Sequence, residues 1–145
     1  MPIDKTGEYW IGTEAADLEA YLKAFQAGGY PVVRAAYSRC RRDGSAIFTV
    51  RVDDEEGYAE RRCVSCGDTV LMLDSEGYAD DATPEVAACP CGGEEFEVAV
   101  GYALYSDGGV RWVSIGLRCV RDGTLGVYAD WKIGYEPSEH LFDRA

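Results

Sequence analysis

The sequence predicts a β-rich α+β domain in which one N-terminal helix covers an antiparallel sheet of hairpins. Three observations predict this class. One amphipathic segment comes first, short segments of alternating hydrophobicity follow it, and turn-forming residues separate those segments. The chain has 145 residues, the size of one ordinary domain, so we expect a single domain over residues 1–145.

The helix is predicted over residues 13–27. Four residues recur at the i, i+3, i+4, i+7 spacing of a single apolar stripe, namely Leu18, Tyr21, Leu22 and Phe25. Two glycines follow the segment and end it. A helix with one apolar stripe needs a partner surface, so we expect it to pack on the sheet.

Strands are predicted over residues 32–37, 46–52, 58–62, 70–73, 96–105, 110–118 and 125–133. The signal is clearest from Phe96 to Leu104, where apolar and other residues alternate strictly. Turn residues at 106–109 then predict a long hairpin with the next strand. Residues 74–88 are rich in acidic and small residues, which indicates a loop with at most one helical turn.

Three short cysteine motifs repeat along the chain. They are Cys40-Arg-Arg-Asp43-Gly44, Cys63-Val-Ser-Cys66-Gly67 and Cys119-Val-Arg-Asp122-Gly123. The first two are followed by similar stretches at residues 54–60 and 74–80, so we interpret them as two related knuckle units, with a third copy near the C-terminus. An Asp-bearing knuckle thus flanks the complete cysteine pair on each side.

Cys63 and Cys66 form a CxxC pair, and Cys89 and Cys91 form a CPC pair; a glycine follows each pair at once. Two sulfurs so close in sequence converge on one metal when the backbone turns tightly, and glycine supplies the positive φ of such a turn. We therefore predict one tetrahedral zinc site with these four cysteines as ligands. A closed shell leaves no position for water, so the predicted ion is structural.

Other interpretations of these four cysteines remain open. Iron is an alternative metal, because rubredoxin-type sites also use four thiolates. Free thiols or two disulfides would need no metal. A redox role for Cys63 and Cys66 is disfavoured, because a redox CxxC normally lies where a strand enters a helix, whereas the residues after Cys66 are predicted to form a strand.

A second metal site is a further hypothesis. Cys40, Asp43, Cys119 and Asp122 would supply two thiolates and two carboxylates if the two flanking knuckles meet, and zinc accepts this mixture. Without a metal, both aspartates would accept backbone hydrogen bonds inside their own turns. A disulfide between Cys40 and Cys119 is a third alternative.

Residues 63–92 resemble the zinc ribbon group of folds, and the resemblance rests on the CxxCG and CPCG motifs. It implies that two knuckles on adjacent hairpins clamp one zinc ion, within an embedded ribbon over residues 58–94. Residues 116–132 resemble bacterial zinc-ribbon proteins. Zinc ribbons occur in transcription factors, ribosomal proteins, enzymes and adaptors, so the resemblance implies a ligand set and no particular activity.

The charge of the chain favours some partners over others. Asp and Glu number 26 against 14 Lys and Arg, which gives a net charge of −12. Such a surface repels nucleic acids and anionic membranes and attracts basic proteins. The sequence shows no secretory signal and no apolar run long enough to cross a membrane. We therefore expect a cytoplasmic protein whose six cysteines are thiols or metal ligands.

No catalytic motif is recognisable, and His140 is the only histidine, so we do not expect an enzyme. The leading hypothesis is a zinc-stabilised acidic binding or adaptor protein, of inhibitor or immunity type, that docks a basic protein. One alternative is a nucleic-acid-binding zinc ribbon that uses an arginine cluster, made of Arg34, Arg39, Arg41, Arg42, Arg51, Arg61 and Arg62. The other is a hydrolase-type enzyme with a carboxylate site.

Overall fold

A computed structural model of the protein describes residues 10–14, 16–25, 30–106, 109–133, 141–142 and 145. The predicted fold class is confirmed: α1 and a β-rich antiparallel sheet account for most of the regular structure of the described residues. The elements in chain order are α1 (Ala16–Phe25), β1 (Arg34–Tyr37), β2 (Ile47–Asp53), β3 (Tyr58–Cys63), β4 (Thr69–Leu71), η2 (Ser75–Tyr78), β5 (Glu85–Val86), β6 (Phe96–Leu104), β7 (Val110–Cys119) and β8 (Leu125–Lys132).

Each predicted strand forms, with bounds that differ from the predicted ones by one or two residues at most. One element, the strand β5, was not predicted. The two-residue strand β5 is too short to show any periodicity, and η2 is the single helical turn expected within the loop at 74–88. Helix α1 begins at Ala16 rather than at residue 13, and residues 15, 26 and 27 of the predicted helix lie outside the described residues.

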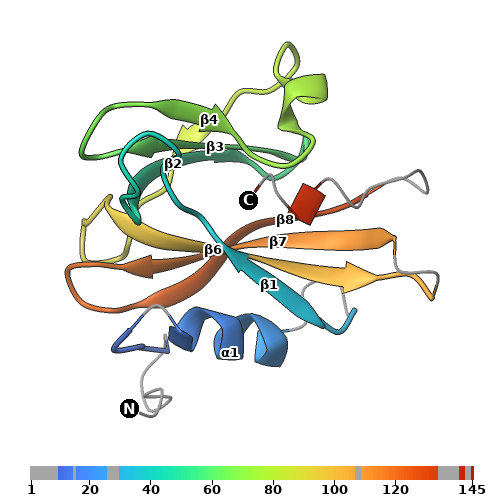
Figure 1. Ribbon diagram of the computed structural model, residues 1–145, viewed down its shortest axis with the longest axis horizontal. Coiled ribbons are helices and arrows are strands. Elements are labelled where there is room, and N and C mark those ends of the chain that lie inside the picture. The colour runs from blue at the N-terminus through green and yellow to red at the C-terminus, as the bar shows by residue number, and fades with distance from the viewer. Residues whose placement is uncertain (1–9, 15, 26–29, 107–108, 134–140, 143–144) are drawn as a thin grey trace.

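The sheet is open and has the strand order β4-β3-β2-β6-β7-β8, with β1 paired to β6 and β5 paired to β2. Figure 1 shows how it folds into two layers: β2, β3 and β4, called the β2–β4 lobe below, lie over β6, β7 and β8, and α1 covers the opposite face of that second layer.

The main core lies between the two layers. Phe48 and Val50 of β2 and Val98 and Tyr102 of β6 are all buried there. A second, smaller core joins the layer to the helix, where Leu18 and Leu22 of α1 pack with Ala99 and Leu125. The predicted packing of the helix on the sheet is therefore confirmed.

Close approach of the helix depends on a small residue in β7. A Cβ atom at Gly116 would lie only 3.0–3.2 Å from side-chain atoms of Leu22. Larger side chains at this position would push the helix off the sheet, because packed interiors leave no free volume for them.

The eight strands form two similar halves related by an approximate two-fold axis. Strands β1 to β4 correspond in order to strands β5 to β8. The first strand of each half pairs with the second strand of the other half: Tyr37 of β1 faces Ala99 of β6, and Val86 of β5 faces Arg51 of β2. The axis passes where the two halves meet, since Phe48 of β2 is paired with Phe96 of β6.

Hydrogen bonds outside the ladders repeat in the same way. The Ser38 N–H donates to the Val98 carbonyl at 3.0 Å, and in the other half the Ala87 N–H donates to the Val50 carbonyl at 2.8 Å. The register of the central hairpin repeats as well. Phe48 of β2 faces Cys63 of β3, and Phe96 of β6 faces Cys119 of β7. These independent matches identify the duplicated unit as a four-stranded segment that carries two knuckles.

This finding corrects the repeat predicted from the sequence. The motifs at Cys40 and Cys63 are not successive copies of one unit; they are the first and second knuckles of the same half. Their similar tails also differ in structure, since residues 54–60 form a turn and the start of β3, whereas residues 74–80 contain η2.

Asp53 fastens the linker between the halves to the β2–β3 turn. Its carboxylate accepts hydrogen bonds from the backbone N–H groups of Thr83 at 2.8 Å, Glu55 at 3.1 Å and Glu56 at 3.2 Å. The Thr83 N–H is the main reason that the pKa of Asp53 lies below its usual value. We expect Asp53→Ala to lower the thermal unfolding midpoint by about 5 °C, because three N–H groups lose their acceptor.

The matched control is Glu55→Ala in the same turn, whose side chain is exposed and should leave the midpoint unchanged. Calorimetry of the metal-loaded proteins measures both values. Equal midpoints for the two variants would contradict the role given to Asp53.

Candidate metal centres

Four tight turns, called knuckles here, carry all six cysteines. In the first, the Cys40 N–H donates to the Ser45 carbonyl at 2.8 Å and the Gly44 N–H donates back to the Cys40 carbonyl at 2.9 Å. The knuckles that begin at Cys63 and Cys119 repeat both bonds. The CPC knuckle at Cys89 is one residue shorter and keeps the same pair of bonds. Each turn therefore presents two ligand side chains in a fixed geometry.

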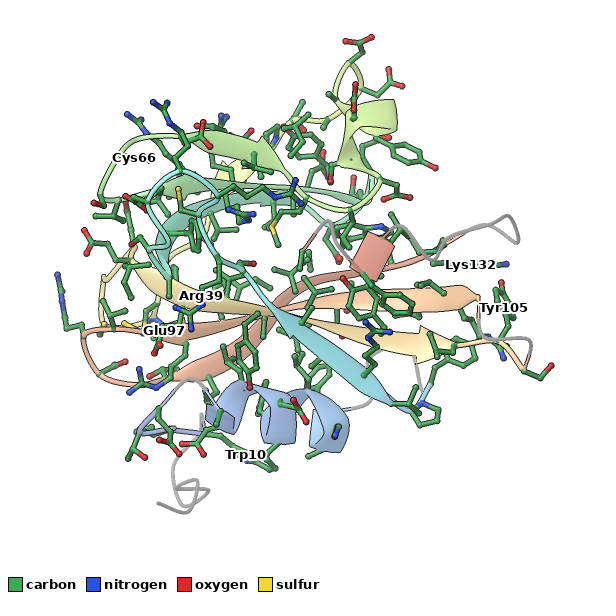
Figure 2. The ribbon with its side chains drawn as sticks, in the orientation of Figure 1. Trp10, Arg39, Cys66, Glu97, Tyr105 and Lys132 are labelled. Carbon is green, nitrogen blue, oxygen red and sulfur yellow. The ribbon has the colours of Figure 1, made fainter. Side chains whose placement is uncertain are left out.

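The knuckles meet in pairs and form two clusters of metal-ligand atoms. The first centre contains Cys40, Asp43, Cys63 and Cys66, and the second centre contains Cys89, Cys91, Cys119 and Asp122. Within each centre the ligand atoms all lie within 4.8 Å of one another. Figure 2 shows Cys66 at the margin of the β2–β4 lobe, away from the β6–β8 layer that carries the second centre.

The ligand grouping predicted from the sequence is wrong in both parts. Cys63 and Cys66 do not meet Cys89 and Cys91, and the predicted second site of Cys40, Asp43, Cys119 and Asp122 is divided between the two centres. The reason is the hairpin within each half: β2 and β3 bring the knuckle before β2 next to the knuckle after β3, and β6 and β7 do the same. All eight candidate ligands are used, in two sets of three thiols and one carboxylate.

Both centres contain one close contact between two sulfurs and one between a sulfur and a carboxylate. The Cys40 and Cys66 sulfurs are 3.5 Å apart, and the Cys91 and Cys119 sulfurs are 3.7 Å apart. The Cys63 sulfur lies 3.6 Å from both Asp43 carboxylate oxygens. The Cys89 sulfur lies 3.5 Å from the nearer oxygen of Asp122.

These separations fit the edges of a tetrahedron around zinc. With Zn–S distances of about 2.3 Å and Zn–O distances of about 2.1 Å, tetrahedral geometry places two sulfurs about 3.8 Å apart and a sulfur and an oxygen about 3.6 Å apart. A disulfide would instead need about 2.05 Å between sulfurs. All six cysteines are free, and Cys40 and Cys119 belong to different centres, so the alternatives that invoked disulfides are not realised in this structure.

Both aspartates are held as anions by their own turns. The Ser45 N–H donates to Asp43 at 2.9 Å, and the Thr124 N–H donates to Asp122 at 3.0 Å. These bonds lower the pKa of Asp43 and hold the pKa of Asp122 at about 2. The turn role expected without a metal is therefore present, and both oxygens of each carboxylate still lie within 3.7 Å of a cysteine sulfur.

Each centre has two buried and two exposed ligands. Cys40 and Cys63 are buried in the first, whereas Asp43 and Cys66 are exposed. The buried sulfurs face the main core, and Gly93 packs so closely on the second centre that a Cβ there would lie 3.1 Å from the Cys119 sulfur. Metal ions at these positions would tie the knuckles directly to the core.

The surroundings of the two centres differ in charge. Exposed Arg42 and Arg62 and the buried Arg61 lie on the knuckles and strand of the first centre. Exposed Glu94 and Glu95 follow the CPC knuckle of the second centre. The arginine cluster predicted from the sequence is thus partly assembled beside the first centre, while Arg34 lies apart and stacks on Phe142.

A groove of about 380 Å³ crosses the outer face of the β2–β4 lobe and contains the carboxylates Glu60 and Glu94. Glu60 is already engaged: it accepts a hydrogen bond from the Tyr58 hydroxyl at 2.9 Å and pairs with Arg51 at 3.5 Å. His140 lies outside the described residues. The groove therefore offers fewer groups for ligand binding or catalysis than the two centres do.

The predicted ribbon at 58–94 is not the segment that encloses a ligand set here; the two sets span 40–66 and 89–122.

Within the described residues, no helix combines the length and apolar character needed to span a bilayer. Comparison of the chain with protein-family models, with curated proteins and with solved structures finds no match.

Proposed function

We propose that this protein binds two structural zinc ions and serves as a small acidic binding or adaptor protein that docks a basic protein partner. Zinc is favoured because three thiolates with one carboxylate in a tetrahedral arrangement suit it, whereas an all-sulfur set would leave iron an equal choice. Six free thiols also suit a reducing compartment, so we place the protein in the cytoplasm.

A structural rather than catalytic role follows from the ligand count. Four protein ligands fill a tetrahedral zinc shell and leave no position for a substrate or an activated water. We therefore propose that the protein is not an enzyme. The hydrolase alternative would depend on the groove that contains Glu60 and Glu94, where one of the two acids is held by Tyr58 and Arg51.

The observation that carries the docking proposal is a concentration of acidic side chains at the end of the β2–β4 lobe opposite the first centre. Glu55 and Glu56 lie in the β2–β3 turn, and Asp80 and Asp81 lie in the linker that Asp53 holds against this turn. These four side chains are exposed and form no ion pair within the described part of the chain. A basic surface would complement them.

Capture from native lysate tests this proposal. The zinc-loaded protein should retain a basic protein at low salt and release it as salt rises, because exposed charges are screened. Glu55→Lys together with Glu56→Lys should abolish the capture. The matched control, Glu94→Lys with Glu95→Lys, reverses an acidic pair on the other half and should leave the capture intact.

Capture that survives the Glu55→Lys, Glu56→Lys change would contradict the assignment of this surface. Recovery of nucleic acid in place of protein would instead favour the second candidate function, a nucleic-acid-binding protein. The specific observation behind that candidate is the exposure of Arg42 and Arg62 beside the first centre.

A further inference from the structure

The two-fold relation between the halves allows the two centres to be compared position by position. Val50 faces Arg61 in the first half, and Val98 faces Leu117 in the second. Arg61 and Leu117 therefore occupy equivalent places, each two residues before a buried ligand, Cys63 or Cys119, and on the same face of its strand. The first half thus has a cation where the second has an apolar side chain.

Arg61 is buried, with 3 % of its surface exposed. Its Nε donates to the main-chain oxygen of Ala145 at 3.1 Å, and its guanidinium lies 4.8 Å from the centre of the Phe48 ring. No Asp or Glu side chain forms an ion pair with it within the described residues. A buried charge of this kind is costly unless a countercharge lies close to it.

The first centre supplies that countercharge when it is filled. Three thiolates and one carboxylate around a divalent ion leave a net charge of about −2. A fixed cation beside a filled centre of this charge favours the filled state. Leu117 gives the second centre no such help.

Two exposed carboxylates beside the second centre act in the same direction, and the exposed Arg121, whose guanidinium donates to the Cys91 carbonyl at 3.4 Å, offsets one of them. Ala46 and Ile47 lie where the chain enters β2, beside the first centre. Their counterparts in the second half are Glu94 and Glu95. The equivalence is fixed by matching bonds: the Val64 N–H donates to the Ile47 carbonyl at 3.2 Å, as the Val120 N–H donates to the Glu95 carbonyl at 3.1 Å. Two carboxylates beside a dianionic centre weaken its hold on the ion.

We propose that the two centres are unequal: the first holds its ion tightly because Arg61 compensates its charge, and the second is the exchangeable centre that releases its ion first. The proposal rests on the assignment of metal to both centres. Arg61 acts here as a charge-compensating residue and is not itself a ligand.

The order of release can be read directly from the cysteines. The purified zinc-loaded protein is titrated with a chelator, thiols exposed at each step are alkylated, and the modified positions are identified by mass spectrometry. We expect Cys89, Cys91 and Cys119 to be alkylated while the other three cysteines remain protected. Simultaneous release, or earlier alkylation of Cys40, Cys63 and Cys66, would overturn the proposal.

Arg61→Met should lower the zinc affinity of the first centre by about 10–100-fold, the usual effect of losing a group that supports metal ligands. Arg61→Lys keeps the charge and should restore most of that affinity, which a purely structural role would not explain. The matched control is Arg62→Met, the exposed neighbour on the opposite face of β3, which should leave the order of release unchanged.

If Arg61→Met does not fold, Arg61→Lys and the order of release in the wild-type protein still decide the question. Equal effects of Arg61→Met and Arg62→Met would overturn the role of Arg61 and leave the metal assignment intact. Purified protein without any bound metal would overturn the metal assignment itself, and this proposal with it.

Discussion

Cys63→Ser is expected to remove one of two bound zinc ions and to abolish most of the stability of the β2–β4 lobe. Cys63 is almost fully buried, with 1 % exposed, and it ends β3 within the main core. A structural zinc site contributes an apparent binding free energy of about 10–16 kcal/mol, compared with about 5–15 kcal/mol for the net stability of a whole domain. Loss of one ligand therefore threatens the fold itself.

Metal content under native conditions is the decisive measurement. Two separate centres predict two ions in the wild-type protein and one ion each in Cys63→Ser and Cys89→Ser, because the two cysteines serve different centres. A shared four-cysteine site would instead lose its ion in either variant. Val64→Ala, inside the same knuckle but with an exposed side chain that carries no ligand atom, is the control and should retain both ions and the wild-type unfolding midpoint.

Gly123→Ala is expected to destabilise the protein by about 3 kcal/mol or more. Gly123 has a φ of +79°, and a Cβ atom there would overlap the backbone carbonyl oxygen of Gly12. Relief of that overlap requires the segment at residues 10–12 to move off the knuckle, which breaks the bond from the Gly12 N–H to the Gly123 carbonyl at 2.8 Å. Backbone atoms cannot yield as a flexible side chain would, so the cost is large.

Gly44 provides a matched control in the equivalent turn of the first centre. Its φ of +75° is nearly the same, yet a Cβ atom there meets nothing within 4 Å. Gly44→Ala should therefore cost only the left-handed conformation, about 1–2 kcal/mol. Urea unfolding of the two zinc-loaded variants measures the difference, and equal losses would show that the contact with Gly12 is unimportant.

The fold was largely predictable because its signals are local. Alternation from Phe96 to Leu104 specifies a strand with one face in the core, and the stripe that includes Leu18 and Leu22 specifies a helix on a sheet. Strand β5 was not predicted, because two residues are too few to show a periodic pattern of hydrophobicity. Its place is set by a contact across the chain, the pairing of Val86 with Arg51.

The ligands were predictable and their grouping was not. CxxCG, CPCG and CxxDG motifs mark knuckles through the turn that glycine permits, and this signal identified all eight ligands. Which knuckles meet depends on strand pairing, which sequence spacing does not reveal. The two aspartates indicate the correct grouping. Asp43 and Asp122 occupy the second ligand position of their knuckles, as Cys66 does in its own. A division into two centres, each with three cysteines and one aspartate, is therefore consistent with the motifs.

The exchange of first strands between the halves has a consequence for the origin of the chain. Two identical half-length ancestors, related by the same axis, would each have paired their first strand with the second strand of the other. They would therefore have formed an obligate homodimer. Fusion through residues 72–84 would join the two chains of that dimer into one polypeptide. The sequences of the two halves could then differ from each other. The ligand sets differ between the halves accordingly, since aspartate stands at the second ligand position in one and at the fourth in the other.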